Sequence, residues 1–221
     1  MIYDTLEKRK YVIKYDTDAH IPESLIYTLL MQSWKVTPSK NNFMPYTIHI
    51  VGPKDQKYKE LVYLNAASNE GRIDQIDDPL TSRYNVNLPK YANILSCSYL
   101  LIFTMRLEDK PNLYQQMLID RGHNYEAVDE TRLNDMYSTA SFECGLFANT
   151  LSALCLEYDI DSSFTGCFHR NVAQWKDIPF VTRMPIMLMT LGKGIIYNED
   201  VKGDLGQKDI RPDFERIVNF I

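Results

Sequence analysis

The chain has 221 residues, of which 45% are hydrophobic and 24% charged, as in a soluble globular protein that buries a real core. The formal net charge is −5 and the Lys and Arg residues are scattered, which argues against the clustered basic surface that nucleic-acid binding requires. The N-terminal sequence has no apolar core of signal-peptide length, and no apolar stretch is long enough to cross a bilayer. We therefore expect a soluble, cytoplasmic protein without a nucleic-acid or membrane partner.

A helix followed by a strand is predicted for the first quarter of the chain. Pro22 can begin a helix, because its missing N–H would have no partner in the first turn anyway. Residues 22–35 predict an amphipathic helix, whose apolar residues at helical spacing are Leu25, Ile26, Leu29, Leu30 and Trp34. The turn-forming residues 37–42 end this helix. The β-branched sequence YTIHIV of residues 46–51 follows them and predicts a strand.

The middle of the chain combines a helix, a polar segment and a buried strand. Residues 54–68 predict a helix. Residues 69–90 are polar and irregular, and they predict a long surface excursion. Residues 97–105, CSYLLIFTM, form a continuous apolar run with polar flanks, which is the pattern of a strand buried on both faces.

The second half of the chain is mostly helical. Residues 112–122 and 129–136 predict two short helices, and residues 137–158 predict a long one. This long helix is apolar almost all round, so it must be buried on every side, either in the centre of the domain or in a subunit interface. Residues 184–191, MPIMLMTL, predict a third buried strand, and residues 214–218 a final helix.

The alternation of helices and strands predicts a sandwich in which helices pack over a mixed sheet, of the α/β or α+β class. Nothing marks a domain boundary, so residues 1–221 are expected to form one domain. Within it, residues 69–90 and 106–136 are candidates for excursions or a lid.

Four segments could carry chemistry. Residues 8–11, KRKY, form a basic cluster, and residues 38–46 form a turn-rich loop that leads into the first predicted strand. Residues 159–167, DIDSSFTGC, contain small residues that let the backbone approach a ligand closely. Residues 208–212 place cations before the last helix. Taken singly, these segments also fit ordinary structural roles: a solvated face, a helix cap or a tight connection.

In their order and spacing, these segments resemble the FMN-dependent nitroreductase family. That family opens with an Arg-Arg-Ser-like cluster, an aromatic-Asp pair and a helix that begins Ile-Pro. The chain has Arg9-Lys10-Tyr11, Tyr15-Asp16 and Ile21-Pro22-Glu23 at these places. The family's Pro-Ser-x-x-Asn-x-Gln-Pro-Trp loop corresponds to residues 38–46, PSKNNFMPY, with four of the six defined positions matched.

The later part of the family pattern is also present. An apolar helix that contains Ala148-Asn149 leads to Phe164-Thr165-Gly166, where the family has a large-small-Gly connection to the flavin ring. Leu191-Gly192 ends a strand, and Arg211 precedes the terminal helix. The resemblance therefore spans nearly the whole chain. It implies an α+β, three-layer sandwich with a mixed, mostly antiparallel sheet flanked by helices, and an intertwined homodimer with FMN sites in its interface.

The resemblance also assigns cofactor contacts to three groups of residues. Four cations would hold the FMN phosphate, a task for which Arg is well shaped: Arg9, Lys10, Lys208 and Arg211. The isoalloxazine ring, with a backbone N–H directed at its N5, would be lined by Phe164, Thr165 and Gly166. The other subunit would contribute Pro38, Ser39, Lys40 and Asn42.

Three positions depart from the family pattern. Tyr11 stands where the family has Ser, and Ile13 stands in place of a basic residue. Met44 replaces the Gln that contacts the pyrimidine edge of the flavin. Tyr11 and Met44 remain cofactor-site candidates by position. The family's Asn at the flavin O2/N3 edge corresponds to either Asn87 or Asn93.

Titratable residues do not form a catalytic or metal-binding pattern. No Ser/His/Asp or Cys/His arrangement can be proposed on spacing, because the histidines are separated: His20, His49, His123 and His169. No CxxC pair occurs, and buried free thiols in a reducing compartment are expected for Cys97, Cys144 and Cys155. Glu143 is unusual in an apolar helix, and we expect it to pair with an Arg across a dimer interface, the alternative being a carboxylic acid with a shifted pKa.

The resemblance implies an FMN-dependent oxidoreductase. Hydride would pass from NADH or NADPH to flavin N5 and on to a nitroaromatic, a quinone or a similar small acceptor, without a catalytic side chain. Two alternatives stay open. One is a specialised relative, in which residues 69–90 and 106–136 form a lid that selects one substrate. The other is a protein that keeps the fold, with or without flavin, but has no turnover.

Overall fold

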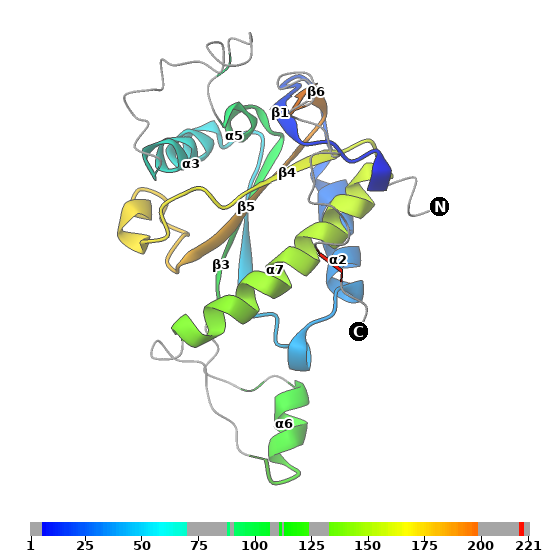
Figure 1. The fold of residues 1–221 in the computed structure, drawn as a ribbon, viewed down its shortest axis with the longest axis vertical. Helices are drawn as coiled ribbons and strands as arrows, with labels where there is room; N and C mark the ends of the chain where they lie inside the picture. The colour runs from blue at the N-terminus through cyan, green and yellow to red at the C-terminus, as the bar shows by residue number, and fades with distance from the viewer. Residues whose placement is uncertain are drawn as a thin grey trace.

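The structure, a computed structural model, describes residues 6–69, 88, 91–106, 111, 113–123, 133–198 and 217–218. Its strands are β1 (Val12–Tyr15), β2 (Tyr46–Val51), β3 (Tyr99–Met105), β4 (Asp161–Thr165), β5 (Pro185–Gly192) and β6 (Gly194–Tyr197). Four of them form an antiparallel sheet in the order β2-β3-β5-β4 (Figure 1). The other two, β1 and β6, pair as an antiparallel ribbon.

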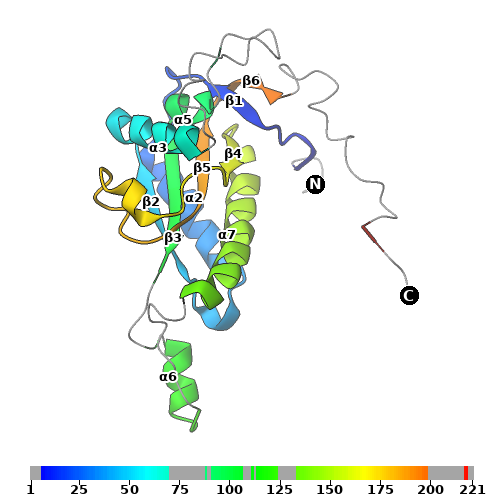
Figure 2. The same cartoon turned by 60° about the vertical axis from the view of Figure 1, so that its left-hand side comes forward.

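Helices cover both faces of the sheet. The α-helices are α2 (Glu23–Val36), α3 (Gln56–Asn69), α5 (Ala92–Ser96), α6 (Leu113–Ile119) and α7 (Leu133–Leu156), and two short 3₁₀ helices are η1 (Lys40–Asn42) and η4 (Val172–Trp175). Figure 2 shows α2 and α7 on one side of the sheet, and α3, α5 and η4 on the other. The described chain is therefore an α+β, three-layer sandwich.

The central strand β3 explains why its sequence is apolar without alternation. Tyr99, Leu101 and Phe103 pack into the core under α2 and α7, whereas Leu100 and Ile102 pack into the core under α3 and α5. Every residue of β3 is buried, because both faces of the strand are covered. The prediction of a strand buried on both faces is confirmed.

Most predicted elements are confirmed within one or two residues. The strand predicted for residues 46–51 has the bounds of β2, and the strands predicted for residues 97–105 and 184–191 correspond to β3 and β5. The helices predicted for residues 22–35 and 54–68 correspond to α2 and α3. The helix predicted for residues 112–122 is shorter, since α6 ends at Ile119.

One strand was not predicted, and one sequence interpretation was wrong. Residues 159–167, for which the sequence left a tight connection open, contain β4, which pairs with β5 along its whole length. Residues 129–136 and 137–158 are not two separate helices, because α7 runs without a break from Leu133 to Leu156. Residues 129–132 and 214–216, and nearly all of residues 69–90, lie outside the described residues.

Helix α7 has one buried side and one exposed side within the chain. Its buried side, which faces the sheet and α2, includes Ala140, Cys144, Phe147 and Leu151. Its exposed side carries Ser138, Phe142, Gly145 and Asn149, and the Phe142 side chain is 66% exposed. The expectation that α7 is buried on every side is thus not met by one chain alone. An exposed aromatic ring on an otherwise apolar helix is typical of a subunit interface.

Candidate functional site

The basic cluster Arg9-Lys10-Tyr11 leads directly into β1, and one side chain of β4 fixes β1 in place. Ser163 Oγ accepts a hydrogen bond from the backbone N–H of Val12 at 2.8 Å and donates one to the carbonyl oxygen of Val12 at 3.0 Å. These two hydrogen bonds to one residue hold the basic cluster beside the end of β4. Two of the groups that the sequence assigned to the cofactor, the basic cluster and Phe164-Thr165-Gly166, therefore lie together.

Arg9 lies over Phe164 with an unused donor. Its guanidinium carbon is 4.9 Å from the centroid of the Phe164 ring, a cation–π distance. The Nε atom is buried and has no hydrogen-bond partner among the described residues. Burial lowers the pKa of Arg9, which the neighbouring Tyr15 and Tyr11 partly offset. A bound anion would supply the missing acceptor and favour the charged guanidinium, so Arg9 fits a phosphate group.

The other two residues of the cluster make different contacts. The Lys10 ammonium is 5.1 Å from the centroid of the Tyr197 ring. Tyr11 is hydrogen-bonded by the side chain of Asn93, and burial raises its pKa. Asn93 itself is buried in α5. Of the two sequence candidates for the flavin-edge Asn, Asn93 therefore lies beside the basic cluster, whereas Asn87 is outside the described residues.

Gly166 follows β4, and the chain has room for a small side chain at this position. A Cβ atom built on Gly166 would meet only the Nη2 atom of Arg170, at 3.7 Å, which is ordinary van der Waals contact. The φ angle of Gly166 also lies outside the left-handed region that favours glycine. By contrast, a Cβ on Gly192 would come within 2.6 Å of Tyr15 Cδ1. Gly192 is thus required by packing within the chain, whereas nothing in the described residues requires glycine at position 166.

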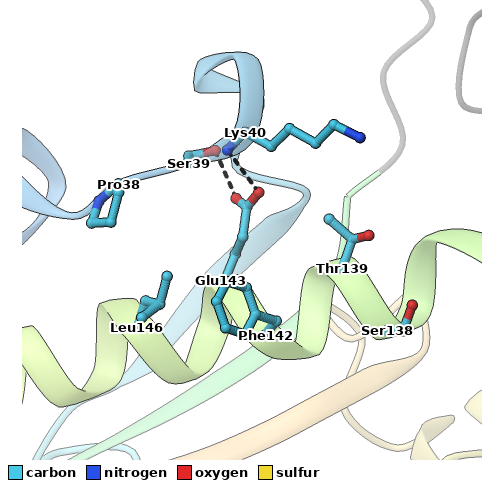
Figure 3. Close-up of a pocket in the computed structure, with 8 residues that line it drawn as sticks. All are labelled: Pro38, Ser39, Lys40, Ser138, Thr139, Phe142, Glu143 and Leu146. Atoms are coloured by element: carbon cyan, nitrogen blue, oxygen red, sulfur yellow. Dashed lines mark hydrogen bonds between the residues drawn. The ribbon is translucent and has the colours of Figure 1, made fainter. Parts of the chain in front are cut away.

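The loop before β2 is anchored to α7 by Glu143. Ser39 Oγ donates to one carboxylate oxygen at 2.6 Å, and the backbone N–H of Lys40 donates to the other at 3.0 Å (Figure 3). Ser39 Oγ also accepts from the backbone N–H of Met44 at 2.8 Å. The prediction that Glu143 pairs with an Arg across a dimer interface was wrong, because its partners are a hydroxyl and an amide of the same chain. Glu143 as a whole residue is 3% exposed, so this anchor is internal.

These residues line a groove on the exposed side of α7. The α7 groove, as we call it, has a volume of about 780 Å³, which is within the range of small-molecule sites. It is lined by Pro38, Ser39, Lys40, Ser138, Thr139, Phe142, Glu143 and Leu146. Figure 3 shows the Lys40 side chain extending away from the Glu143 carboxylate, so its ammonium is separate from the anchor. The groove thus combines three of the loop residues that the sequence assigned to the cofactor.

The second half of the same loop faces a different groove. Asn42 and Met44 line a mostly apolar groove between α2 and β2, together with Tyr27, Leu30, Met31, Trp34, Phe43, Tyr46, Ile48, Ile50, Arg106 and Phe147. Arg106 Nε donates to the carbonyl oxygen of Met44 at 3.0 Å. The side chain of Met44 packs against the core under α2. Met44 is therefore in an apolar setting, away from the α7 groove.

The remaining sequence candidates divide into described and undescribed ones. Lys208 and Arg211 lie outside the described residues. The prediction of buried free thiols is confirmed for Cys97, Cys144 and Cys155, and burial raises the pKa of all three, to about 12 for Cys97. Among the described residues, no cluster of His, Cys, Asp or Glu could hold a metal ion. Nor is any helix in the described part of the chain long and apolar enough to cross a membrane.

Two residues near the site were missed by sequence reasoning. Ser163 was noted only as a small residue, although it joins β4 to β1. Arg170 lies four residues after Gly166, and its Nη1 donates to the carbonyl oxygen of Ile186 at 3.1 Å and to the Tyr137 hydroxyl. The cation closely following a Gly-containing segment was the one available pointer to Arg170. No sequence pattern pointed to Ser163, whose partner is 151 residues away.

The fold is shared with solved structures of flavin-related proteins. No protein-family model matches the sequence, and neither does any curated protein. A nitroreductase-like protein of Streptococcus mutans is 19% identical with a TM-score of 0.65, over 99% of this chain and 97% of that one. A protein of Staphylococcus epidermidis, assigned as an NAD(P)H:FMN oxidoreductase, is 16% identical with a TM-score of 0.66, over 100% and 96%. A protein of Exiguobacterium sibiricum, assigned as a nitroreductase and solved with FMN, is 14% identical with a TM-score of 0.63, over 100% and 97%.

Proposed function

We propose that this chain, which has the nitroreductase fold, is an FMN-dependent oxidoreductase. It would take hydride from NADH or NADPH and reduce a small acceptor such as a nitroaromatic or a quinone. The observation that carries the proposal is the pairing of Arg9, with its unpartnered buried Nε, and Gly166, a glycine that packing within the chain does not require, at the end of β4. The former fits a phosphate and the latter a ring that approaches the backbone. When bound, FMN would supply the hydride-accepting chemistry.

Each group of residues has a separate task in this proposal. Arg9 and Lys10 would hold the phosphate, and Lys208 and Arg211 are proposed as further phosphate ligands. Phe164, Thr165 and Gly166 would line the ring, and a backbone N–H of this segment would donate to N5. Tyr11, which is hydrogen-bonded by Asn93, belongs to the same cluster as Arg9 and Lys10. The three buried thiols take no part, because a raised pKa keeps them protonated and unreactive.

We further propose that the active form is a homodimer in which each FMN is shared. The hydrogen bonds of Ser39 and Lys40 run to α7, so in one chain this loop belongs to the α7 groove and not to β4. A second copy would bring Pro38, Ser39, Lys40 and Asn42 to the flavin. Gly145 supports this arrangement, because a Cβ there would meet nothing within 4 Å, although glycine within a helix costs about 0.5–1 kcal/mol relative to alanine. Close approach of another surface would explain why glycine stands there.

The proposal is tested by turnover of the flavin-loaded protein. Under anaerobic conditions, NADH or NADPH should be oxidised when a nitroaromatic or a quinone is present. Free FMN without the protein should oxidise the nucleotide more slowly. Gly166→Ala should keep the melting temperature of the unliganded protein, because the added Cβ has room, yet weaken FMN binding and slow turnover. If the wild-type protein binds FMN without oxidising either nucleotide, the chain is a flavin-binding protein and not a reductase.

A further inference from the structure

Arg170 is held in one place by the loop that carries it. The residue lies between β4 and η4, next to His169. The backbone N–H of His169 donates to Asn65 Oδ1 at 3.0 Å, and the Trp175 indole donates to the carbonyl oxygen of His169 at 2.6 Å. Because Asn65 belongs to α3 and Trp175 is buried, the backbone beside Arg170 is fixed to the body of the protein.

The guanidinium is held in a defined orientation as well. Its Nη1 atom donates to the Ile186 carbonyl oxygen and to the Tyr137 hydroxyl. Its carbon is 5.2 Å from the centroid of the Tyr137 ring and 5.3 Å from that of Phe168. Two acceptors and two rings thus orient a planar group whose Nη2 atom makes no hydrogen bond to the described residues and lies 3.7 Å from where a Cβ of residue 166 would stand.

We propose that Arg170 is the cation that faces the flavin ring and favours its reduced form, an inference that rests on the proposed function. Nη2 is the atom nearest to the space where a Gly166 side chain would stand. A ring that fills this space therefore has the Arg170 guanidinium as a neighbour. Reduction adds negative charge to the ring, so a fixed cation beside it binds the reduced flavin more tightly than the oxidised one.

The cations near the ring segment have different positions. Arg9 lies over Phe164 and has the unpartnered buried Nε that fits a phosphate, whereas Lys10 lies over Tyr197. Arg170 follows β4 on the same side as the ring segment, and its Nη2 is the atom within 4 Å of a Cβ built on Gly166. Among the described residues, Arg170 is therefore the cation nearest to position 166.

The test is the two-electron reduction potential of bound FMN in Arg170→Gln, Arg170→Lys and Tyr137→Phe, with Lys176→Gln as the control. Lys176, like Arg170, is an exposed cation between β4 and β5. In Arg170→Gln the preference for reduced over oxidised flavin should fall about tenfold, which is a potential lower by about 30 mV. Tyr137→Phe keeps the charge and removes one anchor, so the potential should fall less. The reduction potential of Arg170→Lys should lie between those of wild type and Arg170→Gln. The reduction potential of Lys176→Gln should equal that of wild type.

The outcomes separate this inference from the proposed function. If wild-type protein does not bind FMN, the proposed function fails. A second outcome is that FMN binds, and that Arg170→Gln has the wild-type potential with a lower melting temperature. Arg170 would then only stabilise the fold through its hydrogen bonds to Tyr137 and Ile186, and the inference would be overturned. An equal fall of the reduction potential in Arg170→Gln and Lys176→Gln would also overturn the inference, because the effect would then come from the general surface charge.

Discussion

Ser163 Oγ bonds to both polar backbone groups of Val12, at 2.8 Å to the nitrogen and 3.0 Å to the oxygen. Val12 is fully buried, so without this hydroxyl its N–H and C=O would compete for other partners inside the protein. The contact joins the strand that follows Arg9 to the strand that precedes Gly166. One serine therefore sets the relative position of the proposed phosphate and ring contacts.

We expect Ser163→Ala to lower both stability and FMN affinity. The free energy of unfolding should fall by about 1–3 kcal/mol, because buried backbone groups lose a partner. Affinity should fall because Arg9 is no longer fixed beside Phe164. Denaturant unfolding and fluorescence titration measure the two effects. Ser162→Ala is the matched control, since Ser162 Oγ contacts Ser152 Oγ at 2.6 Å and lies away from the cluster. Equal FMN affinity in the two variants would contradict the positioning role.

Glu143→Ala is expected to release the loop at residues 38–44. The Ser39 hydroxyl and the Lys40 amide would both lose a charged acceptor, and hydrogen bonds to charged groups contribute about 1.5–3 kcal/mol. Thermal unfolding should show a clear drop in melting temperature. Glu157→Ala is the control, because Glu157 is exposed just after the same helix. Wild-type stability in Glu143→Ala would mean that the anchor does not hold the loop.

Gly145→Ala should have opposite effects on the chain and on its assembly. Alanine improves the helix by about 0.5–1 kcal/mol, and the chain itself leaves room for the Cβ. If a second copy approaches this side of α7, the added methyl group should weaken the dimer. Sedimentation equilibrium should then give a larger dimer dissociation constant together with a more stable monomer. An unchanged dissociation constant would remove Gly145 from the proposed interface.

His49 should make the fold sensitive to mild acid. Burial lowers the pKa of His49, whose Nε2 contacts Thr104 Oγ1 at 3.0 Å. A histidine with a lower pKa in the folded state than in the unfolded state stabilises fully above about pH 6.5 and progressively loses that contribution as the pH falls. His49→Gln should therefore lose less stability between pH 7 and pH 5 than wild type does. His20→Gln, at an exposed site, should follow the wild-type curve.

The long apolar elements could be predicted because residues close together in the sequence show the apolar pattern of a buried strand or helix. β3 and β5 are continuous apolar runs, and α2 carries an apolar stripe between a turn and a proline. β4 could not be predicted in this way, because its sequence DSSFT is polar. Its two serines can be buried because Ser162 is hydrogen-bonded to Ser152 and Ser163 is hydrogen-bonded to Val12. The second of these partners lies far away in the sequence.

In the candidate site, too, local patterns could be predicted and contacts between distant residues could not. The sequence identified the segments that contain Arg9 and Gly166, because basic clusters and glycine-containing connections are local patterns. It could not identify how they are held, since that depends on Ser163 and Arg170 contacting distant residues. Glu143 shows the same limit, because its partner Ser39 is 104 residues away and no local pattern links the two. The interface partner predicted for it was therefore the wrong one.

The most direct measurement is a fluorescence titration of the unliganded protein with FMN and with riboflavin, for wild type, Arg9→Ala and Lys8→Ala. Wild type should bind one FMN per chain and should bind riboflavin, which lacks the phosphate, more weakly. Arg9→Ala should lose about 1.5–3 kcal/mol of FMN binding, roughly ten- to a hundredfold, and keep its riboflavin affinity. Lys8→Ala, at an exposed neighbouring cation, should match wild type. No saturable FMN binding by wild type, or equal FMN affinity in Arg9→Ala, would contradict the account.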